Sequence, residues 1–233
     1  WDASKAGLKS AFELHPVGDH SADDMVGFWG MAFRKFSPTL KDTGWYKTYC
    51  ETGEPTRTEQ MRLALAEAGF PSDDHASLLS EAYARERDIR LQLFPEAKEV
   101  LDTLIQDYPL GLITNGPADI QRQEIATLGI EGYFKNIYIE GEMGIGKPHA
   151  TVFERAAKAV ECTPAELLFV GNSYGHDVRP ALENGWSAYW IRRPSDVAPS
   201  RNAPEERPVD GPEPTAVITD LREVLTLLAA QQG

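Results

Sequence analysis

The sequence is poor in cysteine, in basic residues and in long apolar runs. Its two cysteines, Cys50 and Cys162, lie far apart and outside any Cys-x-x-Cys or Cys/His ligand spacing. This spacing argues against a disulfide framework and against a zinc site, and isolated thiols favour a reducing, cytoplasmic location. No apolar run approaches the roughly 20 residues that span a bilayer, and the N-terminus lacks a signal-peptide pattern. We therefore expect no membrane partner.

Lysine and arginine total 23 against 36 aspartates and glutamates, for a formal net charge of -13. Because affinity for nucleic acid depends largely on Lys and Arg neutralising phosphates, we expect no nucleic-acid partner. With 42% hydrophobic residues, a chain of 233 residues can bury a sizeable core, as one large domain or as a domain with a smaller inserted one. The chain starts at Trp1 instead of a methionine, so we expect translation to begin upstream.

The first part of the chain predicts helices and no convincing strand. Apolar residues recur there at mixed spacings of three and four, as in helices with one buried face. Thr58 and Ser72 are plausible N-caps. The expected helices are residues 3–14, 21–36, 58–69 and 72–87. We expect residues 1–92 to form an all-helical domain.

From residue 93 onward, predicted helices and strands alternate. The expected strands are residues 109–113, 136–139, 167–170 and 187–191. Such alternation predicts an α/β fold with a parallel sheet covered by helices on both faces. The proline-rich stretch 193–214 is expected to be a surface loop, because residues 216–218 and the amphipathic 221–228 resume the fold after it. Residues 93–233 are the expected second domain.

Polar residues follow the first two strand regions of this second domain. Functional groups of open α/β sheets gather at the carboxyl ends of the strands. Thr114, Asn115 and Gly116 follow the first predicted strand, and a hydroxyl with backbone N–H groups suits a phosphoryl oxygen. A turn in which Thr114 caps a helix explains these residues equally well. Lys147 lies in a glycine-rich loop before Pro148, where an ammonium would neutralise a phosphoryl group. A solvated surface lysine is the alternative.

A third loop follows the predicted strand at residues 167–170 and offers an amide and a carboxylate. Asn172 and Asp177 lie five positions apart in Gly-Asn-Ser-Tyr-Gly-His-Asp. Oxygen ligands of this kind suit Mg²⁺. Capping of the next helix by Asp177 is the alternative interpretation.

Successive predicted strands are followed first by a hydroxyl, then by a lysine and then by a loop with an amide and a carboxylate. This order of residues resembles the motif order of the haloacid dehalogenase (HAD) superfamily. The flanking sequences Gly-Leu-Ile-Thr-Asn-Gly, Gly-Lys-Pro-His and Val-Gly-Asn-Ser are similar too. The layout looks like subfamily I, with a helical cap, and is similar to phosphatases of the N-acylneuraminate-phosphatase and 5′-nucleotidase type. The resemblance covers essentially the whole chain. It implies a HAD-like Rossmannoid parallel sheet core over residues 93–233 and an all-helical cap domain over residues 1–92.

The resemblance implies a phosphatase that hydrolyses a small phosphorylated metabolite through an aspartyl-phosphate intermediate. Thr114 and the backbone N–H groups of Asn115 and Gly116 would hold the phosphoryl oxygens. Lys147 would pair with the phosphate and the nucleophile, which makes Thr114 and Lys147 the implied catalytic residues.

The implied cofactor is Mg²⁺, with Asn172 and Asp177 as its ligands. Asn172 stands where the family more often has aspartate. An amide oxygen brings one less negative charge, so we expect weaker metal binding than an acid would give.

The family's first motif, a hydrophobic strand ending in Asp-x-Asp-x-Thr, is not found in this sequence. Asp2 is the one aspartate near the start, but no strand precedes it, and the residues after it predict the first cap helix. We therefore expect the first core strand, with its nucleophilic aspartate, to lie upstream of residue 1.

Two other functions are compatible with the same motifs. A haloacid dehalogenase shares the fold and uses no metal, and a HAD-like binding or regulatory protein would keep the scaffold without the nucleophile. The chain is expected to be a monomer or a homodimer. Substrate choice is expected in the cap, where the following residues offer charge and aromatic surface: Arg34, Lys35, Trp45, Tyr46 and Lys47.

Overall fold

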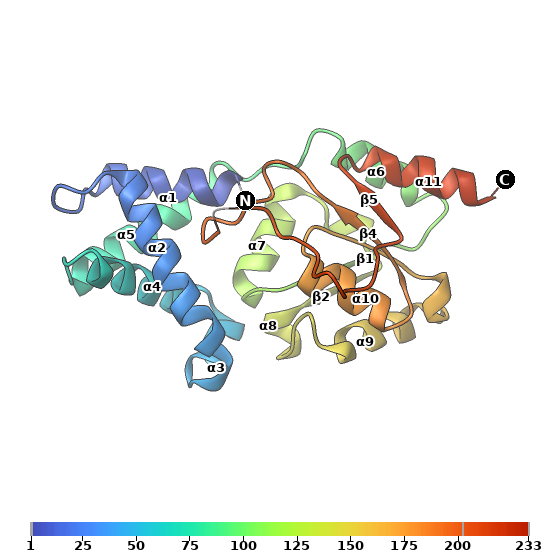
Figure 1. The fold of residues 1–233 in the computed structure, drawn as a ribbon, viewed down its shortest axis with the longest axis horizontal. Coiled ribbons are helices and arrows are strands. Elements are labelled where there is room, and N and C mark those ends of the chain that lie inside the picture. The colour runs from blue at the N-terminus through green and yellow to red at the C-terminus, as the bar shows by residue number, and fades with distance from the viewer. Residues whose placement is uncertain (1, 202, 233) are drawn as a thin grey trace. The chain divides into compact units, whose positions relative to one another are not determined.

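A computed structural model describes residues 2–201 and 203–232 of the chain, so that Trp1, Asn202 and Gly233 lie outside the described residues. The chain divides into two compact units (Figure 1). Unit 1 comprises Trp1–Gln92, Gly116–Thr127 and Val197–Pro204. Unit 2 comprises Leu93–Asn115, Leu128–Asp196 and Glu205–Gly233.

Unit 1 is built from helices that pack through their apolar faces. Ser21 starts the second helix with a capping box, in which its side chain accepts the Asp24 N–H while the Asp24 carboxylate accepts the Ser21 N–H. A buried cluster joins four of these helices and includes one residue from each: Leu8, Met25, Met61 and Leu79. The elements are α1 (Asp2–Leu14), α2 (Ala22–Phe36), η1 (Ser37–Asp42), α3 (Trp45–Glu51), α4 (Glu54–Glu67), α5 (Asp73–Asp88) and α7 (Ala118–Leu128).

The N-cap predicted at Thr58 is wrong, because α4 begins four residues earlier at Glu54. Pro55 lies in the first turn of α4, where a missing backbone N–H costs no hydrogen bond. The Thr58 hydroxyl lies instead 2.8 Å from Ser80 Oγ on α5. Ser72 is confirmed as the N-cap of α5, since its side chain accepts the backbone N–H three residues later.

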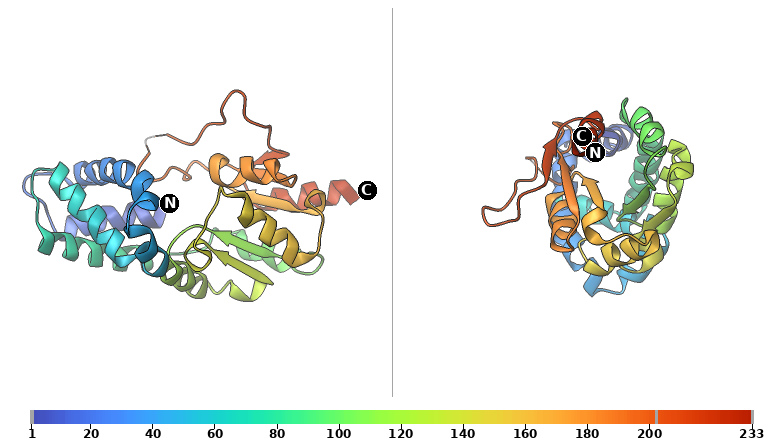
Figure 2. Two further views of the ribbon diagram at one scale, coloured as in Figure 1. Left: turned by 90° about the horizontal axis from the view of Figure 1, so that it is seen from below. Right: turned by 90° about the vertical axis from the view of Figure 1, so that its right-hand side faces the viewer.

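The described residues of unit 2 contain five strands, and every pair is parallel, as the sequence predicts. They form two sheets instead of one, with the orders β1-β2 and β3-β4-β5. Figure 2 shows the green strands β1 and β2 and the gold to red strands of the other sheet. The strands are β1 (Gly111–Thr114), β2 (Asn136–Ile139), β3 (Leu168–Gly171), β4 (Ser187–Ile191) and β5 (Ala216–Ile218).

The division into two sheets leaves β1 and β3 each paired on one side only among the described residues. β4 has partners on both sides, and its residues from Ala188 to Ile191 are buried. The residues of β3 are only partly buried, although Leu168, Phe169 and Val170 are apolar. Apolar strands of parallel sheets are normally covered on both faces and paired at both edges. One edge of β1 and one edge of β3 thus have no strand partner among the described residues.

Helices and turns of unit 2 pack on these strands through two buried clusters. One includes Phe153, Tyr174 and Trp186, and the other joins Tyr189 to Val224. The predicted loop at 193–214 contains no helix or strand in its described residues. The elements are α6 (Ala97–Leu104), η2 (Glu131–Tyr133), α8 (Glu140–Met143), α9 (Ala150–Val160), η3 (Pro164–Glu166), the π-helical turn η4 (Tyr174–Val178), α10 (Arg179–Glu183) and α11 (Arg222–Gln232).

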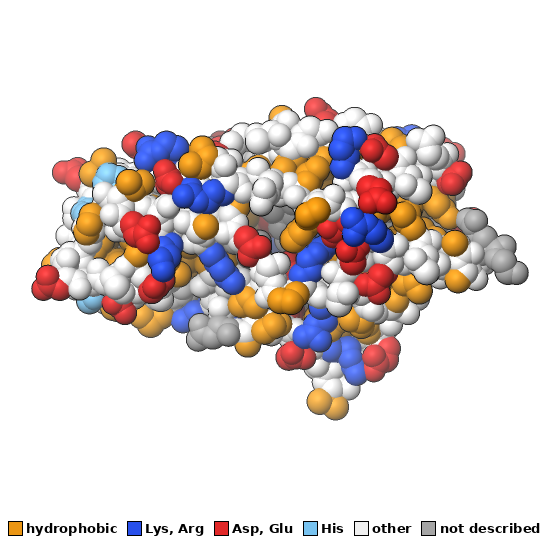
Figure 3. Space-filling view, turned by 90° about the horizontal axis from the view of Figure 1, so that it is seen from above, with side chains coloured by type: hydrophobic (Ala, Val, Ile, Leu, Met, Phe, Trp, Pro, Cys, Tyr) orange, Lys and Arg blue, Asp and Glu red, His pale blue; other side chains and the backbone are white. Residues whose placement is uncertain are grey.

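Within the described part of the chain, every helix is too short or too polar to cross a membrane. The face drawn in Figure 3 carries side chains of both signs next to one another.

Candidate active site

Lys147 lies at the edge of unit 2 where β1 ends. Its Nζ donates to the Ile113 carbonyl oxygen at 3.0 Å and to Asp177 Oδ1 at 2.7 Å. The side chains of Lys147 and Asp177 are only 11% and 7% exposed. The same Nζ lies 5.3 Å from the centre of the Phe169 ring on β3. The predicted lysine is therefore a buried, paired ammonium and not a solvated surface group.

Asn115 fixes the loop that carries Lys147. Its Nδ2 donates to the Lys147 carbonyl oxygen at 2.7 Å, and its Oδ1 accepts the Lys147 N–H at 2.8 Å. The side-chain amide thus satisfies both backbone groups of the lysine, as a neighbouring strand would. The Asn115 side chain is thus occupied by its contacts with the Lys147 backbone.

Thr114 is the last residue of β1 and follows Ile113, whose carbonyl binds the ammonium. Its side chain is partly buried. Gly116, two residues on, has a φ of 138°, a backbone conformation that favours glycine. Thr114, Asn115, Lys147 and Asp177 are therefore brought together at one edge of unit 2.

Asp177 lies against the end of β3. A Cβ added to Gly171 would be 2.5 Å from the Asp177 Cβ, so only glycine fits there. While Oδ1 of Asp177 pairs with Lys147, Oδ2 accepts the Ser173 N–H at 2.9 Å. The carboxylate is thereby held in one orientation.

Asn172 lies in the same loop as Asp177, but its side chain is exposed and approaches Asp196 Oδ1 at 3.4 Å. Its backbone carbonyl accepts the indole N–H of Trp190 at 3.1 Å. Within the described residues, no group of three or more His, Cys, Asp or Glu side chains is arranged to hold a metal ion. The two predicted metal ligands are thus close in sequence, and only Asp177 is fixed by hydrogen bonds to Lys147.

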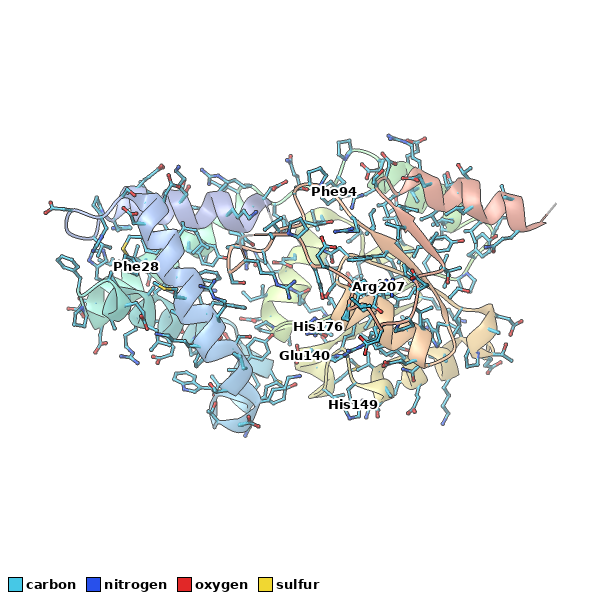
Figure 4. All side chains as sticks on the ribbon, in the orientation of Figure 1. Phe28, Phe94, Glu140, His149, His176 and Arg207 are labelled. Atoms are coloured by element: carbon cyan, nitrogen blue, oxygen red, sulfur yellow. The ribbon has the colours of Figure 1, made fainter. Side chains whose placement is uncertain are left out.

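Glu140 is a residue of this region that the sequence motifs did not indicate. It follows β2 directly and is 3% exposed (Figure 4). A Cβ at Gly146 would lie 2.6 Å from the Glu140 Cδ and 2.7 Å from Asn115 Oδ1, so the loop needs glycine there. The rule that polar groups follow strand ends applies equally to Glu140, which comes directly after the predicted strand 136–139.

Of the five cap residues expected to select substrate, Arg34 and Lys35 make polar contacts inside unit 1, and the rings of Trp45 and Tyr46 pack against Phe36 and Tyr49. Arg34 donates to the Ser200 carbonyl oxygen, and Lys35 pairs with Glu67. These contacts give both side chains a structural role.

The sequence profile of the family described as "Haloacid dehalogenase-like hydrolase" matches residues 36–191, which is more than half of the chain. The chain belongs to this family. The resemblance to the HAD superfamily is therefore confirmed, together with the α/β fold that it implied.

The chain is similar to several proteins of the HAD family. It is 38% identical to a phosphoserine phosphatase of Thermus thermophilus over 73% of the chain and 64% of that relative. It is 30% identical to the N-acylneuraminate-9-phosphatase of Mus musculus over 60% of the chain and 58% of that protein. The chain thus spans somewhat less than two thirds of both relatives. The crystal structure of the HAD-hydrolase YfnB of Bacillus subtilis bound to magnesium covers 97% of the chain and 91% of YfnB, at 21% identity and a TM-score of 0.73.

Proposed function

We propose that this protein is a Mg²⁺-dependent phosphatase that hydrolyses a small phosphorylated metabolite through an aspartyl-phosphate. The observation that carries the proposal is the Lys147 ammonium, which is buried between the Ile113 carbonyl and Asp177 at the carboxyl edge of the strands. A fixed, water-excluded cation at this edge is suited to charge that develops on a transferring phosphoryl group. Relatives named for phosphoserine and N-acylneuraminate phosphatase activities support the substrate class.

In this proposal the phosphoryl oxygens bind beside Lys147. Thr114 Oγ and the backbone N–H groups of Asn115 and Gly116 donate to them, while the Asn115 side chain keeps the Lys147 loop in place. Binding of this kind acts through position and charge, which are the main contributions of a protein to phosphoryl transfer.

Asp177 and Asn172 are the residues that would hold Mg²⁺. One carboxylate with an amide oxygen agrees with the way proteins bind this ion, through one or two carboxylates together with waters and substrate phosphate. When bound, Mg²⁺ supplies positive charge that stabilises the phosphoryl group in the transition state. Both oxygens of Asp177 accept hydrogen bonds, from Lys147 and from the Ser173 N–H, which fix the orientation of this carboxylate.

The nucleophilic aspartate is assigned to a further strand, expected upstream of residue 1. Asp2 does not suit this role, because it is the first residue of the helix α1 in unit 1. The open edges of β1 and β3 support the assignment, since a parallel strand could pair with either and end at the carboxyl edge where Lys147 lies. Residues 1–92 are the proposed helical cap, in which substrate selection is expected.

The test is a phosphatase assay on the protein extended through its native upstream sequence. A panel of sugar phosphates, phosphoserine and nucleotides is assayed with Mg²⁺ and with a chelator, and activity is expected only with the metal. Lys147→Ala and Asp177→Asn are expected to lower kcat/KM by about 100-fold or more, the scale of losing one transition-state charge contact. Lys158→Ala on α9, which removes an exposed lysine, is the matched control and should change little.

Phosphatase activity that is equally high with the chelator would show that the reaction does not require Mg²⁺. Phosphatase activity that is equally high in Lys147→Ala and Lys158→Ala would remove the proposed site.

A further inference from the structure

Residues 205–213, here called the 205–213 segment, contact the loop between Asn172 and Asp177. The segment ends the long proline-rich connection between β4 and β5, and it lies in unit 2 with that loop. Two separate sets of hydrogen bonds join the segment to the loop. No sequence motif pointed to either of them.

The first set of contacts is made by the Glu205 carboxylate. Its Oε2 accepts the Ser173 hydroxyl and its Oε1 accepts the Gly175 N–H, both at 2.9 Å. Glu205 is half-buried, whereas its neighbours Pro204 and Glu206 are exposed. An ionised carboxylate only accepts, so it matches two donors, and hydrogen bonds to a charged group are about twice as strong as neutral ones.

The second set of contacts is made at Tyr174, which is 2% exposed. Its hydroxyl donates to the Pro212 carbonyl oxygen at 2.8 Å. A Cβ at Gly211 would lie 2.4 Å from that hydroxyl, so the approach requires glycine. Arg207, labelled in Figure 4, donates to the Gly211 carbonyl oxygen and pairs with Glu213, which closes the turn before Pro212.

The contacts continue from the segment to the buried ion pair. Glu205 binds the Ser173 side chain, and the Ser173 N–H binds Asp177 Oδ2. The other oxygen of Asp177 binds Lys147. A chain of four hydrogen-bonded residues therefore runs from the 205–213 segment to the ammonium, and partners of this kind orient the groups that bind a ligand.

We propose that Glu205 is a positioning residue, which holds the 172–177 loop so that Asp177 is oriented for the metal and for Lys147. The part of this proposal that concerns Mg²⁺ rests on the proposed phosphatase function. The part that concerns the loop rests on the hydrogen bonds alone.

The experiment compares Glu205→Gln with Glu206→Gln in the full protein. Glu206 is next in sequence and 76% exposed, and its side chain pairs with Arg192. Both variants remove one negative charge at adjacent positions, so a difference between them reports the hydrogen bonds. Three quantities are measured: hydrogen exchange of the Gly175 amide by NMR, the Mg²⁺ concentration that gives half-maximal shifts of amides 172–177, and the same midpoint for activity.

In Glu205→Gln the Gly175 amide is expected to exchange faster. Both Mg²⁺ midpoints are expected to rise by about tenfold, the lower end of losses seen when partners of metal ligands are removed. The KM for the phosphate ester and the melting temperature should change little, and Glu206→Gln should match the wild type in every measurement.

Unchanged Gly175 exchange and Mg²⁺ midpoints would overturn the proposal. Equal effects in the two variants would overturn it as well, because they would report net charge alone. If the wild-type protein hydrolyses no phosphate ester, the proposed function fails, whereas the amide exchange and the NMR titration still decide the role of Glu205.

Discussion

Lys147 and Asp177 carry opposite charges at a site where both side chains are almost fully buried. Removing two charges from water is costly, and the cost is offset here by their 2.7 Å contact, by the hydrogen bond that Lys147 donates to the Ile113 carbonyl oxygen and by the one that Asp177 accepts from the Ser173 N–H. Removing one partner leaves the other charge buried without compensation. The stability of unit 2 should therefore depend on both residues together.

Lys147→Met is expected to lower the free energy of unfolding by about 3–5 kcal/mol, the range for breaking a buried pair from one side. The double variant Lys147→Met with Asp177→Asn should lose less than the sum of the two single losses. Urea denaturation measures all three. Lys98→Met is the control, because its pair with Asp102 has exposed fractions of 68% and 53% and should contribute less than about 1 kcal/mol. Additive losses at Lys147 and Asp177 would contradict the coupling.

A second buried acid, Glu96, is 5% exposed and pairs with Arg193. Burial alone would raise the pKa of Glu96, but backbone N–H donors and the Arg193 guanidinium outweigh it and lower the pKa below the usual 4.5. The folded protein therefore keeps Glu96 ionised at pH values where the unfolded chain takes up a proton. The ionised Glu96 carboxylate therefore adds to the free energy of unfolding above pH 4.5. This contribution is lost as the pH falls through the lowered pKa of Glu96.

The free energy of unfolding of the wild type is expected to fall more steeply below pH 4.5 than that of Glu96→Gln. At pH 7 the variant should be the less stable of the two. Urea denaturation at a series of pH values checks both statements, with Glu206→Gln as an exposed control. Parallel curves for the wild type and Glu96→Gln would show that Arg193 does not lower the pKa of this carboxyl.

Single strands of unit 2 differ in how many neighbours they have. β4 is hydrogen-bonded to β3 and β5, whereas β1 is bonded to β2 alone among the described elements. An amide in a strand with two partners exchanges with solvent only after wider opening of the sheet. Amides of β4 should therefore be the better protected.

Hydrogen exchange, measured on the chain of residues 1–233, tests the difference in amide protection between β4 and β1. The amides of β4 are expected to exchange more slowly than those of β1 on the edge away from β2. The proposed strand upstream of residue 1 predicts that the same β1 amides become slower in a protein extended upstream. Equally slow exchange of β1 and β4 in the shorter chain would contradict an open edge.

The whole molecule carries a formal net charge of -13. Charges of both signs adjoin on the face in Figure 3, but acidic residues exceed basic ones by 13 over the chain. Such an excess of negative charge destabilises the folded state, because its like charges repel one another. Salt screens this repulsion between charges that are more than about 10 Å apart at 0.1 M. Salt weakens exposed ion pairs and so acts in the opposite direction, but each pair contributes little to the free energy of unfolding.

The melting temperature is expected to rise when NaCl is increased from low concentration to about 0.15 M. The rise should be about 2–4 °C for each kcal/mol of repulsion that is screened, the usual conversion for a chain of this size. Thermal unfolding followed by circular dichroism measures it, with a non-electrolyte at equal osmolality as the control. A melting temperature that falls with salt would show that ion pairs dominate over net charge.

Local patterns in the sequence determined much of this protein. Alternating helix and strand signals after residue 93 predicted parallel pairing, and the strands at 136–139 and 187–191 agree with β2 and β4. Thr114, Lys147 and Asp177 were indicated because each follows a predicted strand, and parallel strands bring their ends to one edge. These properties depend on residue type and spacing within short windows, which a single sequence displays.

Only the tertiary structure decided which side chains meet. The Lys147–Asp177 contact joins residues 30 positions apart, and the Ser173–Glu205 contact joins residues 32 apart. The roles of the Asn115 side chain and of Glu205 were likewise invisible in the local pattern, as was the separation of the strands into two sheets. Hydrogen bonds between distant segments depend on how the chain folds back on itself, and neither periodicity nor composition records that.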